Sequence, residues 1–300
     1  MITFLSGGTG TPKLLQGARN ILDDADISVI VNTGEDIWYQ GGHISPDVDT
    51  VMYLFAGILN TDTWWGLKSD TFITNEILMR AYPDYYISIG DKDRAVHILR
   101  AELLEKGMTL TDITKNLCGF FEAKGNILPM SNVPWTTYIR TSDGEMHFQE
   151  YWVKHRGTCE ILEIIHKPPT PPLATSEVLD AIHKADAVII GPSNPVTSIL
   201  PILSCTGVRE ELKKKKVIAI SPFIGDSPVS GPAAGLMQRT GYSADSRGVR
   251  EIYGDLIDHF IQDIRDSIIV PDALHYDTLM KSPKIAEDLM REILSLISVH

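Results

Sequence analysis

Four short apolar runs, each ending in glycine, proline, serine or asparagine, constrain the fold more than any other feature of this sequence. They are ITFLS (2–6), ISVIVN (27–32), ADAVIIGPSNP (185–195) and KVIAISP (216–222). Runs so rich in valine and isoleucine are typical of parallel strands that are buried on both faces of a sheet. The sequence therefore predicts an α/β fold with a Rossmann-like, doubly wound, mostly parallel sheet and helices on both of its faces.

Apolar residues spaced three and four apart predict helices in the segments between and after these runs. The expected ranges are 13–22, 50–59, 94–105, 111–121, 176–184, 198–204 and 282–295. A different pattern occupies about residues 133–170, where TTYIRT, MHFQEYWV and CEILEII favour strands and SDGE favours a turn. We expect one domain over residues 1–300, with an antiparallel β element inserted in it.

Composition excludes several classes of protein. Of the 300 residues 43% are hydrophobic, which is enough for a large core. The net charge is −12 and the longest run of one sign is 213–216, so no nucleic-acid-binding surface is expected. The three cysteines are widely spaced, which favours neither a zinc site nor disulfides. No apolar run approaches the roughly 18 residues of a membrane helix and no leader pattern is evident, so we expect a cytoplasmic protein without a membrane partner.

The first run leads into a glycine-rich loop, LSGGTGTPKLLQG (5–17). Glycines such as Gly8 and Gly10 let backbone N–H groups approach an anion closely, and the helix that follows directs its positive end to the same place. Lys13 stands where a dinucleotide-binding fingerprint needs a third glycine, and the loop does not match GxxxxGK[ST] either. Thr9 and Lys13 add donors that favour a phosphate ligand over the alternative, a tight turn without a ligand.

An acidic loop, NTGEDIWYQGGHISPDVDT (32–50), leaves the second run. Its glycine, proline and serine content argues against a helix before about residue 51. Asp47 and Asp49 lie two residues apart, and such a pair can bind Mg²⁺ while water and phosphate oxygens fill the other positions. The alternative is that either aspartate only caps the following helix. A long loop favours a functional site, and this one also carries Glu35, Asp36 and His43.

Three further loops follow apolar runs. ISIGDKDRA (87–95) comes after a strand-like run, whereas GPSNP (191–195) and SPFIGDSPVSGP (221–232) come after the two most hydrophobic runs. Asp91 and Asp93 in the first of these could bind a ligand or, alternatively, only cap a helix and add charge to its first turn. The other two offer neutral hydrogen bonds that suit a base, a ribose or a phosphate. Because ligands bind at the carboxyl ends of parallel strands, we expect all of these loops to meet in one site.

The sequence has none of the common motifs for a protein nucleophile or a catalytic zinc ion: G-x-S-x-G, HExxH and the protein-kinase set are all absent. Phosphoryl transfer needs mainly positioning, charge neutralisation and a metal ion. Glycine-rich and acidic loops supply those groups, so the residues favour phosphoryl transfer.

Seven motifs resemble those of the CofD family, the 2-phospho-L-lactate transferases, in order and spacing. They are FLSGGTGTPKL, VNTGEDIW, HISPDVDT, IGDKDRA, LPMSN, GPSNP and SPFIGDSPVSGPAAGLM. The resemblance covers residues 4 to about 272 and implies a step in the biosynthesis of coenzyme F-420, the hydride carrier of methanogens and some actinobacteria. The 2-phospho-L-lactate group of lactyl-2-diphospho-5'-guanosine would pass to the terminal ribityl hydroxyl of 7,8-didemethyl-8-hydroxy-5-deazariboflavin (Fo). GMP would be released, and Mg²⁺ would be required.

The resemblance also implies functions for individual residues. The implied catalytic residues are Asp49, Asp47 and His43, and Asp49 is the first choice for placing or deprotonating the hydroxyl. Asp47 and Asp49 would hold the metal ion. Fo would contact Asp49, Ser88, Asn32, Asp36, Ser45 and Asp91. The diphosphate and nucleotide would contact Gly8, Thr9, Gly10, Lys13, Gly191, Ser193 and Asn194.

Several alternatives stay open at this point. A related family of regulatory proteins shares the glycine loop and the fold and binds nucleotide sugars without phospholactyl transfer, but HISPDVDT and IGDKDRA favour the enzyme. An NAD(P)-dependent oxidoreductase is disfavoured because the third glycine is missing. The residues distinguish neither a phospholactyl from a phosphoenolpyruvyl donor nor guanine from another base. The resemblance favours a homodimer, in which Trp64 and Trp65 could lie at the interface or, alternatively, in the core.

Overall fold

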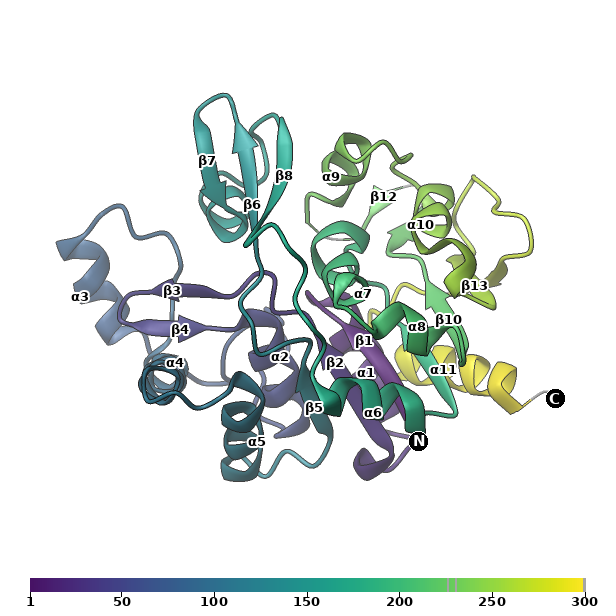
Figure 1. Ribbon diagram of the computed structural model, residues 1–300, viewed down its shortest axis with the longest axis horizontal. Helices are drawn as coiled ribbons and strands as arrows, with labels where there is room; N and C mark the ends of the chain where they lie inside the picture. Colours follow the sequence, from purple (N-terminus) through teal and green to yellow (C-terminus); the bar gives the residue numbers. More distant parts are fainter. Residues whose placement is uncertain (226, 230, 299–300) are drawn as a thin grey trace.

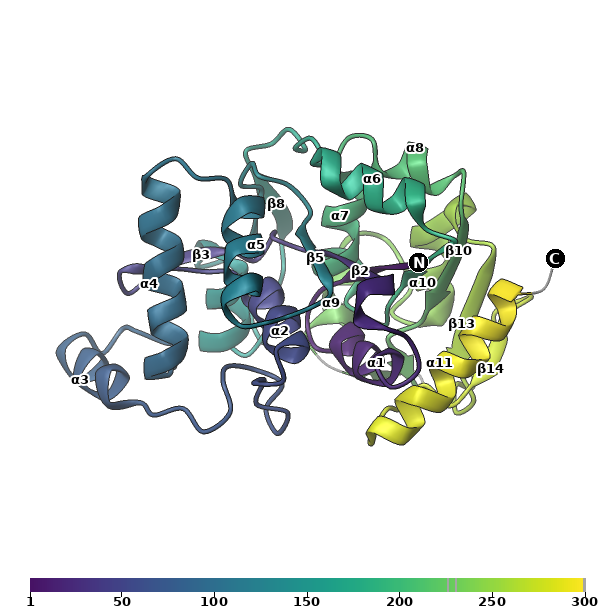
Figure 2. The same ribbon diagram turned by 90° about the horizontal axis from the view of Figure 1, so that it is seen from below.

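The computed structural model describes residues 1–225, 227–229 and 231–298. A seven-stranded sheet runs through the molecule in the order β14-β13-β10-β9-β1-β2-β5 (Figures 1 and 2). Every neighbouring pair of these strands is parallel, which confirms the doubly wound fold class. The strands are β1 (Ile2–Ser6), β2 (Ile27–Val31), β5 (Asn126–Pro129), β9 (Ala187–Ile190), β10 (Lys216–Ile220), β13 (His259–Asp263) and β14 (Leu274–Tyr276).

The strand order reverses between β1 and β9. From β1 the chain extends the sheet through β2 to β5, and from β9 it extends the sheet in the opposite direction through β10 and β13 to β14. The loops that follow β1 and β9 therefore leave the sheet in opposite directions at the carboxyl ends of these two strands. Doubly wound folds bind ligands in the crevice at such a reversal.

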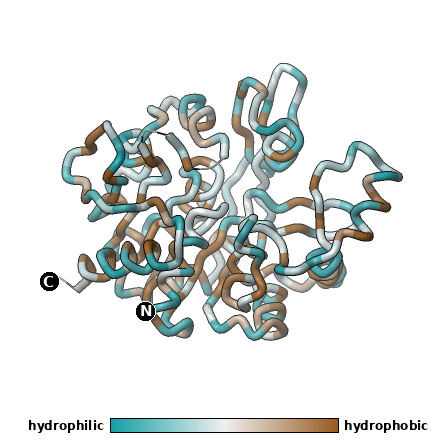
Figure 3. Tube along the Cα trace, turned by 180° about the vertical axis from the view of Figure 1, so that it is seen from behind, coloured by the Kyte–Doolittle hydropathy of each residue, from teal (hydrophilic) through white to brown (hydrophobic). Residues whose placement is uncertain are grey.

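Two layers of helices cover the sheet. Along β1 the side chains alternate, so that Phe4 packs into one layer and Leu5 into the other. Hydrophobic segments accordingly gather in the middle of the molecule (Figure 3). One layer contains α1 (Gly10–Ala18), α2 (Pro46–Phe55), α5 (Leu110–Phe120) and α11 (Pro283–Ser298), and the other contains α6 (Ser176–Lys184), α7 (Leu200–Ser204), α8 (Val208–Leu212) and α10 (Ser246–Tyr253). Among the described residues we find no helix with the length and hydrophobicity to span a membrane.

Two extensions leave this core. An arm at one end of the molecule consists of β3 (Ile37–Tyr39), β4 (Gly42–Ile44), α3 (Ile73–Ala81) and α4 (Asp91–Glu105) (Figure 1). The expected insertion consists of β6 (Thr136–Thr141), β7 (Gly144–His147) and β8 (Glu163–Lys167), and it projects beside α9 (Ala233–Arg239) (Figure 1). Antiparallel pairing of β6 with both β7 and β8 confirms the inserted β element, and the SDGE turn joins β6 to β7.

The structure corrects several expected elements. Helix α2 begins at Pro46, not after residue 50, because a proline with a fixed φ suits the first helical position. Residues 87–90 form no strand; Ile87 and Ile89 pack in a small cluster of the arm. A π-helix, Glu150–Lys154, takes the place of part of the expected strand MHFQEYWV. A second π-helix, Pro195–Ile199, precedes the short α7.

The remaining elements are short. They are the 3-10 helices Asp24–Asp26 and Gly254–Leu256 and the strands β11 (Phe223–Ile224) and β12 (Ser227–Pro228). Two residues of the SPFIGDSPVSGPAAGLM motif, Asp226 and Ser230, lie outside the described residues.

Candidate active site

Two adjoining cavities open at the carboxyl ends of the central strands. The glycine-loop cavity, of about 510 Å³, is lined by the loops after β1, β9 and β10 and by residues 278–281. The acidic cavity, of about 720 Å³, is lined by residues from α2, the arm and the π-helix of the insertion. Five residues line both cavities, and they are Gly8, Thr9, Glu35, Trp64 and Trp152. The two cavities therefore meet at the tip of the glycine loop.

Close backbone contacts fix the shape of the glycine loop. A Cβ atom on Gly10 would lie 1.8 Å from the carbonyl oxygen of Pro192, and one on Gly191 would lie 2.1 Å from Thr11 Oγ1. Thr11 and Ser193 join the loops after β1 and β9 through a hydrogen bond of 2.6 Å between their hydroxyls. Because no side chain caps the N-terminus of α1, its first N–H groups stay open to a ligand. This end of α1 is suited to bind an anion.

Six of the residues expected to contact the nucleotide and diphosphate line the glycine-loop cavity, and they are Gly8, Thr9, Gly10, Lys13, Ser193 and Asn194. Gly191 lies behind them against Thr11. Asn194 also has a structural function, since its Oδ1 accepts a hydrogen bond of 3.0 Å from Val196 N at the start of the π-helix.

Asp47 links the acidic loop to the glycine loop. Its Oδ1 accepts a hydrogen bond of 2.7 Å from Gly8 N, and its Oδ2 accepts one of 2.8 Å from Asn32 Nδ2. Burial raises the pKa of Asp47 to about 6, although both hydrogen bonds favour the charged carboxylate. Asp47 lines the acidic cavity, as does Ser88 from the third loop.

Glu35 is the ionisable side chain among the five residues that line both cavities. Its Oε2 accepts a hydrogen bond of 3.1 Å from Gln149 Nε2, so the insertion reaches the junction of the two cavities. Burial raises the pKa of Glu35 well above its usual range, and the nearby Asp47 carboxylate raises it further. A carboxyl group here can contact ligands on both sides.

Asp49 belongs to a buried network and lines neither cavity. Both of its oxygens contact the Arg100 guanidinium, and Oδ2 lies 3.3 Å from His97 Nε2. His97 Nε2 also lies 3.2 Å from Asp93 Oδ1, which accepts a hydrogen bond of 2.8 Å from the Tyr53 hydroxyl. Burial alone would raise the pKa of Asp49, but Arg100 and His97 outweigh it and hold the pKa at about 2.

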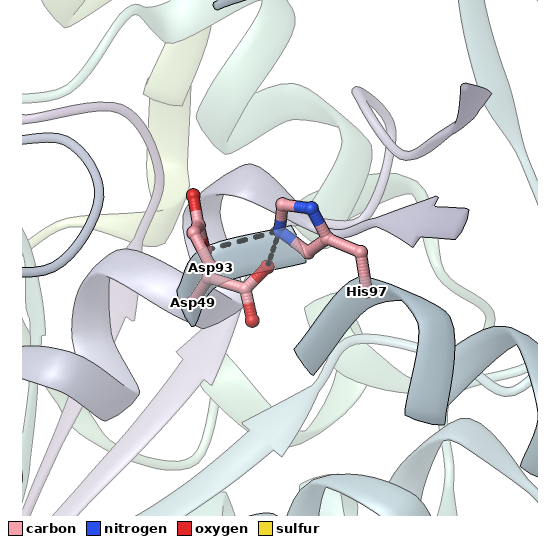
Figure 4. Close-up of side chains that lie close together, drawn as sticks. All are labelled: Asp49, Asp93 and His97. Carbon is pink, nitrogen blue, oxygen red and sulfur yellow. Dashed lines mark ion pairs between the residues drawn. The ribbon is translucent and has the colours of Figure 1, made fainter. Parts of the chain in front are cut away.

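A divalent metal ion could be held by Asp49, Asp93 and His97. One ligand atom from each of these residues lies within 4.8 Å of the others, and all three side chains are buried (Figure 4). Figure 4 shows the His97 ring directed at both carboxylates. This group is compatible with a divalent metal ion; it includes Asp49 but not Asp47 of the expected pair, and its Asp93 lines the acidic cavity.

The other expected Fo-binding and catalytic residues line neither of these two cavities. Ser45 Oγ donates to both oxygens of Asp36 at 2.8 Å, and Asn32 binds Asp47. His43 packs against Trp38, and burial lowers its pKa to about 4. Asp91 caps α3, because its carboxylate accepts hydrogen bonds from the N–H groups of Ile73 and Thr74.

Comparison with known proteins decides the family. The family model described as 2-phospho-L-lactate transferase CofD matches residues 2–292. This chain belongs to the CofD family. It is 70% identical over 295 residues to a 2-phospho-L-lactate transferase of Methanospirillum hungatei JF-1, covering 98% of this chain and 99% of the relative. It is 45% identical over 296 residues to the enzyme of the same name from Methanosarcina mazei, covering 96% and 97%.

A solved structure shares the fold of this CofD-family chain. A protein of the UPF0052 family from Bacillus halodurans superposes with a TM-score of 0.57 at 18% identity, covering 90% of this chain and 81% of that one. At this identity the likeness concerns the fold alone.

The site of this CofD-family chain contains residues to which the sequence alone assigned no function. His97 and Arg100 are such residues; they follow Asp93 at helical spacing on α4, and this polar stripe on one buried face is a signal that could have identified them. Trp64 and Trp152 line both cavities, and Trp64 also packs against one of the core clusters. Nothing in the local pattern distinguished either tryptophan from a core residue.

Proposed function

We propose that this protein transfers the 2-phospho-L-lactate group of lactyl-2-diphospho-5'-guanosine to the terminal ribityl hydroxyl of Fo and releases GMP. The observation that carries the proposal is the junction of two cavities at Gly8, Thr9 and Glu35. A transferase with two substrates needs their reacting atoms side by side, and only at this junction could ligands of the two cavities touch. The names of the relatives support the choice of substrates.

The donor would occupy the glycine-loop cavity. Its diphosphate would lie against the N-terminus of α1, where open N–H groups favour anions. Fo would occupy the acidic cavity, whose wall offers aromatic surface from Trp64, Trp65 and Tyr86 to a planar ring system. Trp65, which also packs against a small hydrophobic cluster of the arm, would thus contact the substrate.

Mg²⁺ is the proposed metal ion. The carboxylates of Asp47, Asp49 and Asp93 are oxygen ligands of the kind that Mg²⁺ prefers, and the first and last of these line the acidic cavity. His97 would complete the set, although imidazole suits transition metals better. When bound, the metal ion would neutralise charge on the diphosphate oxygens.

In the transfer step, the ribityl oxygen forms a bond to the phosphorus that carries the lactyl group, and the bond from that phosphorus to the GMP oxygen breaks. The N–H groups of the glycine loop stabilise the charge on the phosphate oxygens. Glu35 would take the proton of the attacking hydroxyl, because it lines both cavities. Asp49 was our first choice from the sequence for contact with this hydroxyl. Arg100 holds it away from both cavities, so Asp49 is better placed to stabilise the site than to contact the hydroxyl.

The experiment that tests the function is incubation of the protein with Fo, Mg²⁺ and lactyl-2-diphospho-5'-guanosine. We expect stoichiometric GMP and phospholactyl-Fo, separated by chromatography and identified by mass. A protein that binds nucleotide or Fo but releases no GMP would contradict the proposal and favour a binding protein of the same fold. Deazaflavin fluorescence measures Fo binding separately.

We also propose that the protein is a cytoplasmic homodimer. Exposed apolar side chains on and beside α3, namely Phe72, Ile73, Ile77 and Tyr82, support a contact with a second copy. Light scattering of the purified protein tests this, and a monomeric mass at micromolar concentration would contradict it.

A further inference from the structure

Cations and carboxylates are distributed unevenly between the two cavities. Among the described residues, Lys13 and Lys281 are the lysines or arginines that line the glycine-loop cavity, and none lines the acidic cavity. The acidic cavity is lined by four carboxylates, Glu35, Asp47, Asp70 and Asp93, whereas the glycine-loop cavity is lined by Glu35 and Asp62 in addition to its two lysines. An anionic group on a substrate is therefore repelled from the acidic side and attracted to the glycine-loop side.

Lys13 is a half-buried cation that lacks a carboxylate partner in the part of the chain that the structure describes. Its Nζ lies 5.5 Å from the centre of the Trp64 ring. Trp64 lines both cavities, so Lys13 stands next to the junction. Burial lowers the pKa of Lys13, which shows that the surrounding protein does not by itself favour the charged ammonium. A bound anion would provide the missing counter-charge.

The proposed donor has two anionic parts that must be placed separately. Its diphosphate lies between the transferred group and guanosine, whereas its lactyl carboxylate is attached through one carbon and one oxygen to the phosphorus that is transferred. That phosphorus must lie at the junction for the Fo hydroxyl to reach it. The carboxylate then also lies near the junction, and the nucleotide extends toward Lys281 and the other residues that line the glycine-loop cavity alone.

We infer that the Lys13 ammonium binds the carboxylate of the transferred acid, and that Lys13 thereby selects donors that carry an acid over donors that do not. The inference rests on the proposed function and goes beyond it, because it assigns to Lys13 the choice of the transferred group and not general diphosphate binding. The glycine loop and the α1 N-terminus, which need no lysine, bind the diphosphate.

The test compares two donors that differ only in this carboxylate. In the second donor an isopropyl group replaces the lactyl group, so a methyl group stands where the carboxylate was. We measure kcat/KM with Fo for both donors in the wild-type protein and in Lys13→Met, Lys13→Arg and Lys281→Met. A hydrogen-bonded ion pair favours the acid donor by about 10- to 100-fold in the wild type.

In Lys13→Met we expect that preference to fall to within about threefold, while the rate with the isopropyl donor stays near that of the wild type. Lys13→Arg and Lys281→Met should each keep most of the preference. If Lys13→Met slows the reaction of both donors equally, the inference is wrong and Lys13 binds the diphosphate. If the substitution changes neither the rates nor the preference, the inference is also wrong and Lys13 binds neither group. Unaltered Fo fluorescence titration shows that the variant is folded.

The proposed function fails in a different way. If the wild type releases no GMP from the lactyl donor, the function is wrong, whereas an active wild type without a Lys13-dependent preference contradicts only the inference.

Discussion

The two cavities are neighbours, but the protein shapes them by different means. The glycine-loop cavity presents main-chain N–H groups and small side chains, and close backbone contacts such as that between Gly10 and Pro192 fix its geometry. The acidic cavity presents side-chain carboxylates, and buried hydrogen bonds and ion pairs fix their positions. The first depends on the path of the backbone, and the second depends on a balance of buried charges.

This difference predicts which substitutions each of the two cavities tolerates. A site shaped by the backbone should be sensitive to added atoms, because its main-chain N–H groups have fixed positions and do not titrate. A site built from buried charges should be sensitive to the loss of one charge, because the partner is left without compensation in a medium of low dielectric constant. The following predictions test this contrast, from the largest expected effect to the smallest.

The largest effect should come from Arg100→Met on the acidic side. Arg100 is fully buried and contacts both oxygens of Asp49, so its loss leaves the buried carboxylate with His97 as its remaining ion-pair partner among the described residues. We expect the free energy of unfolding to fall by about 3–5 kcal/mol in urea titration. The control Arg140→Met removes an exposed pair with Glu163 and should cost less than about 1 kcal/mol. Equal losses in the two variants would contradict the contrast.

Glu35→Gln tests the junction itself. The substitution keeps the shape of the side chain but removes the carboxylate that lines both cavities. We expect kcat for GMP release to fall by about 100-fold or more, because an amide can accept a hydrogen bond from the attacking hydroxyl but cannot take its proton. The affinity for Fo, measured by fluorescence, should change by less than about threefold.

The matched control for Glu35→Gln is Glu150→Gln. Glu150 lies on the same π-helix as Trp152, pairs with Lys154 at 2.9 Å and lines neither cavity. Its kcat should stay close to that of the wild type. Normal turnover in Glu35→Gln would show that another carboxylate contacts the attacking hydroxyl, and Asp47 would then be the next candidate.

Gly10→Ala tests the backbone-shaped side. The added Cβ would collide with the Pro192 carbonyl at 1.8 Å, so the loops after β1 and β9 must separate. We expect a loss of stability of about 1–3 kcal/mol and a higher KM for the donor, with unchanged Fo affinity. Gly119→Ala in α5 is the control; no atom lies within 4 Å of its added Cβ, and helix propensity should stabilise it by about 0.5–1 kcal/mol. Weaker Fo binding in Gly10→Ala would show that the two sides are not independent.

The smallest effect concerns pH and the acidic side. Burial lowers the pKa of His97, but Asp49 and Asp93 outweigh it and the net shift is upward from 6.5. The folded state therefore keeps the His97 proton to higher pH, and the stability that this provides is complete below about pH 6.5 and is lost as the pH rises through the folded-state pKa. Measured in chelator, the Tm of the wild type should fall toward that of His97→Gln between about pH 6 and pH 9. A constant difference in Tm across this range would mean that His97 is neutral throughout.

Sequence patterns predicted the strands that are uniformly apolar and failed for those that are not. β1, β2, β9 and β10 consist mostly of buried apolar residues. β13 reads HFIQD, and its Gln262 and Asp263 are fully buried. Their burial is possible because Gln262 bonds to the backbone of Ile268 and Val270, and Asp263 accepts a hydrogen bond from Thr278 N. These partners lie outside the strand, in the segment that follows it, so the composition of the strand could not reveal them.

The site was predictable where a loop follows a strand and unpredictable where a helix contributes side chains. The convergence of the loops after β1 and β9 follows from parallel strand order alone. Arg100 was missed because an arginine in a helical pattern is usually exposed, and its burial depends on Asp49 from another helix. Asp91 was expected to bind Fo, yet it caps a helix that the sequence did not predict, α3.

The central position of β1 has a consequence for how the protein is made. Ile2–Ser6 pairs with Ile27–Val31 and with Ala187–Ile190, and the glycine loop packs against Pro192 and Ser193. During synthesis the ribosome must therefore release more than half of the chain before the loop acquires its second wall. The nascent protein exposes one edge of its first strand throughout that time, and folding of this half is slow because its contacts are far apart in sequence. Nucleotide binding would then become detectable only after β9 has been synthesised and has paired with β1, because the nascent chain cannot bind its donor before that.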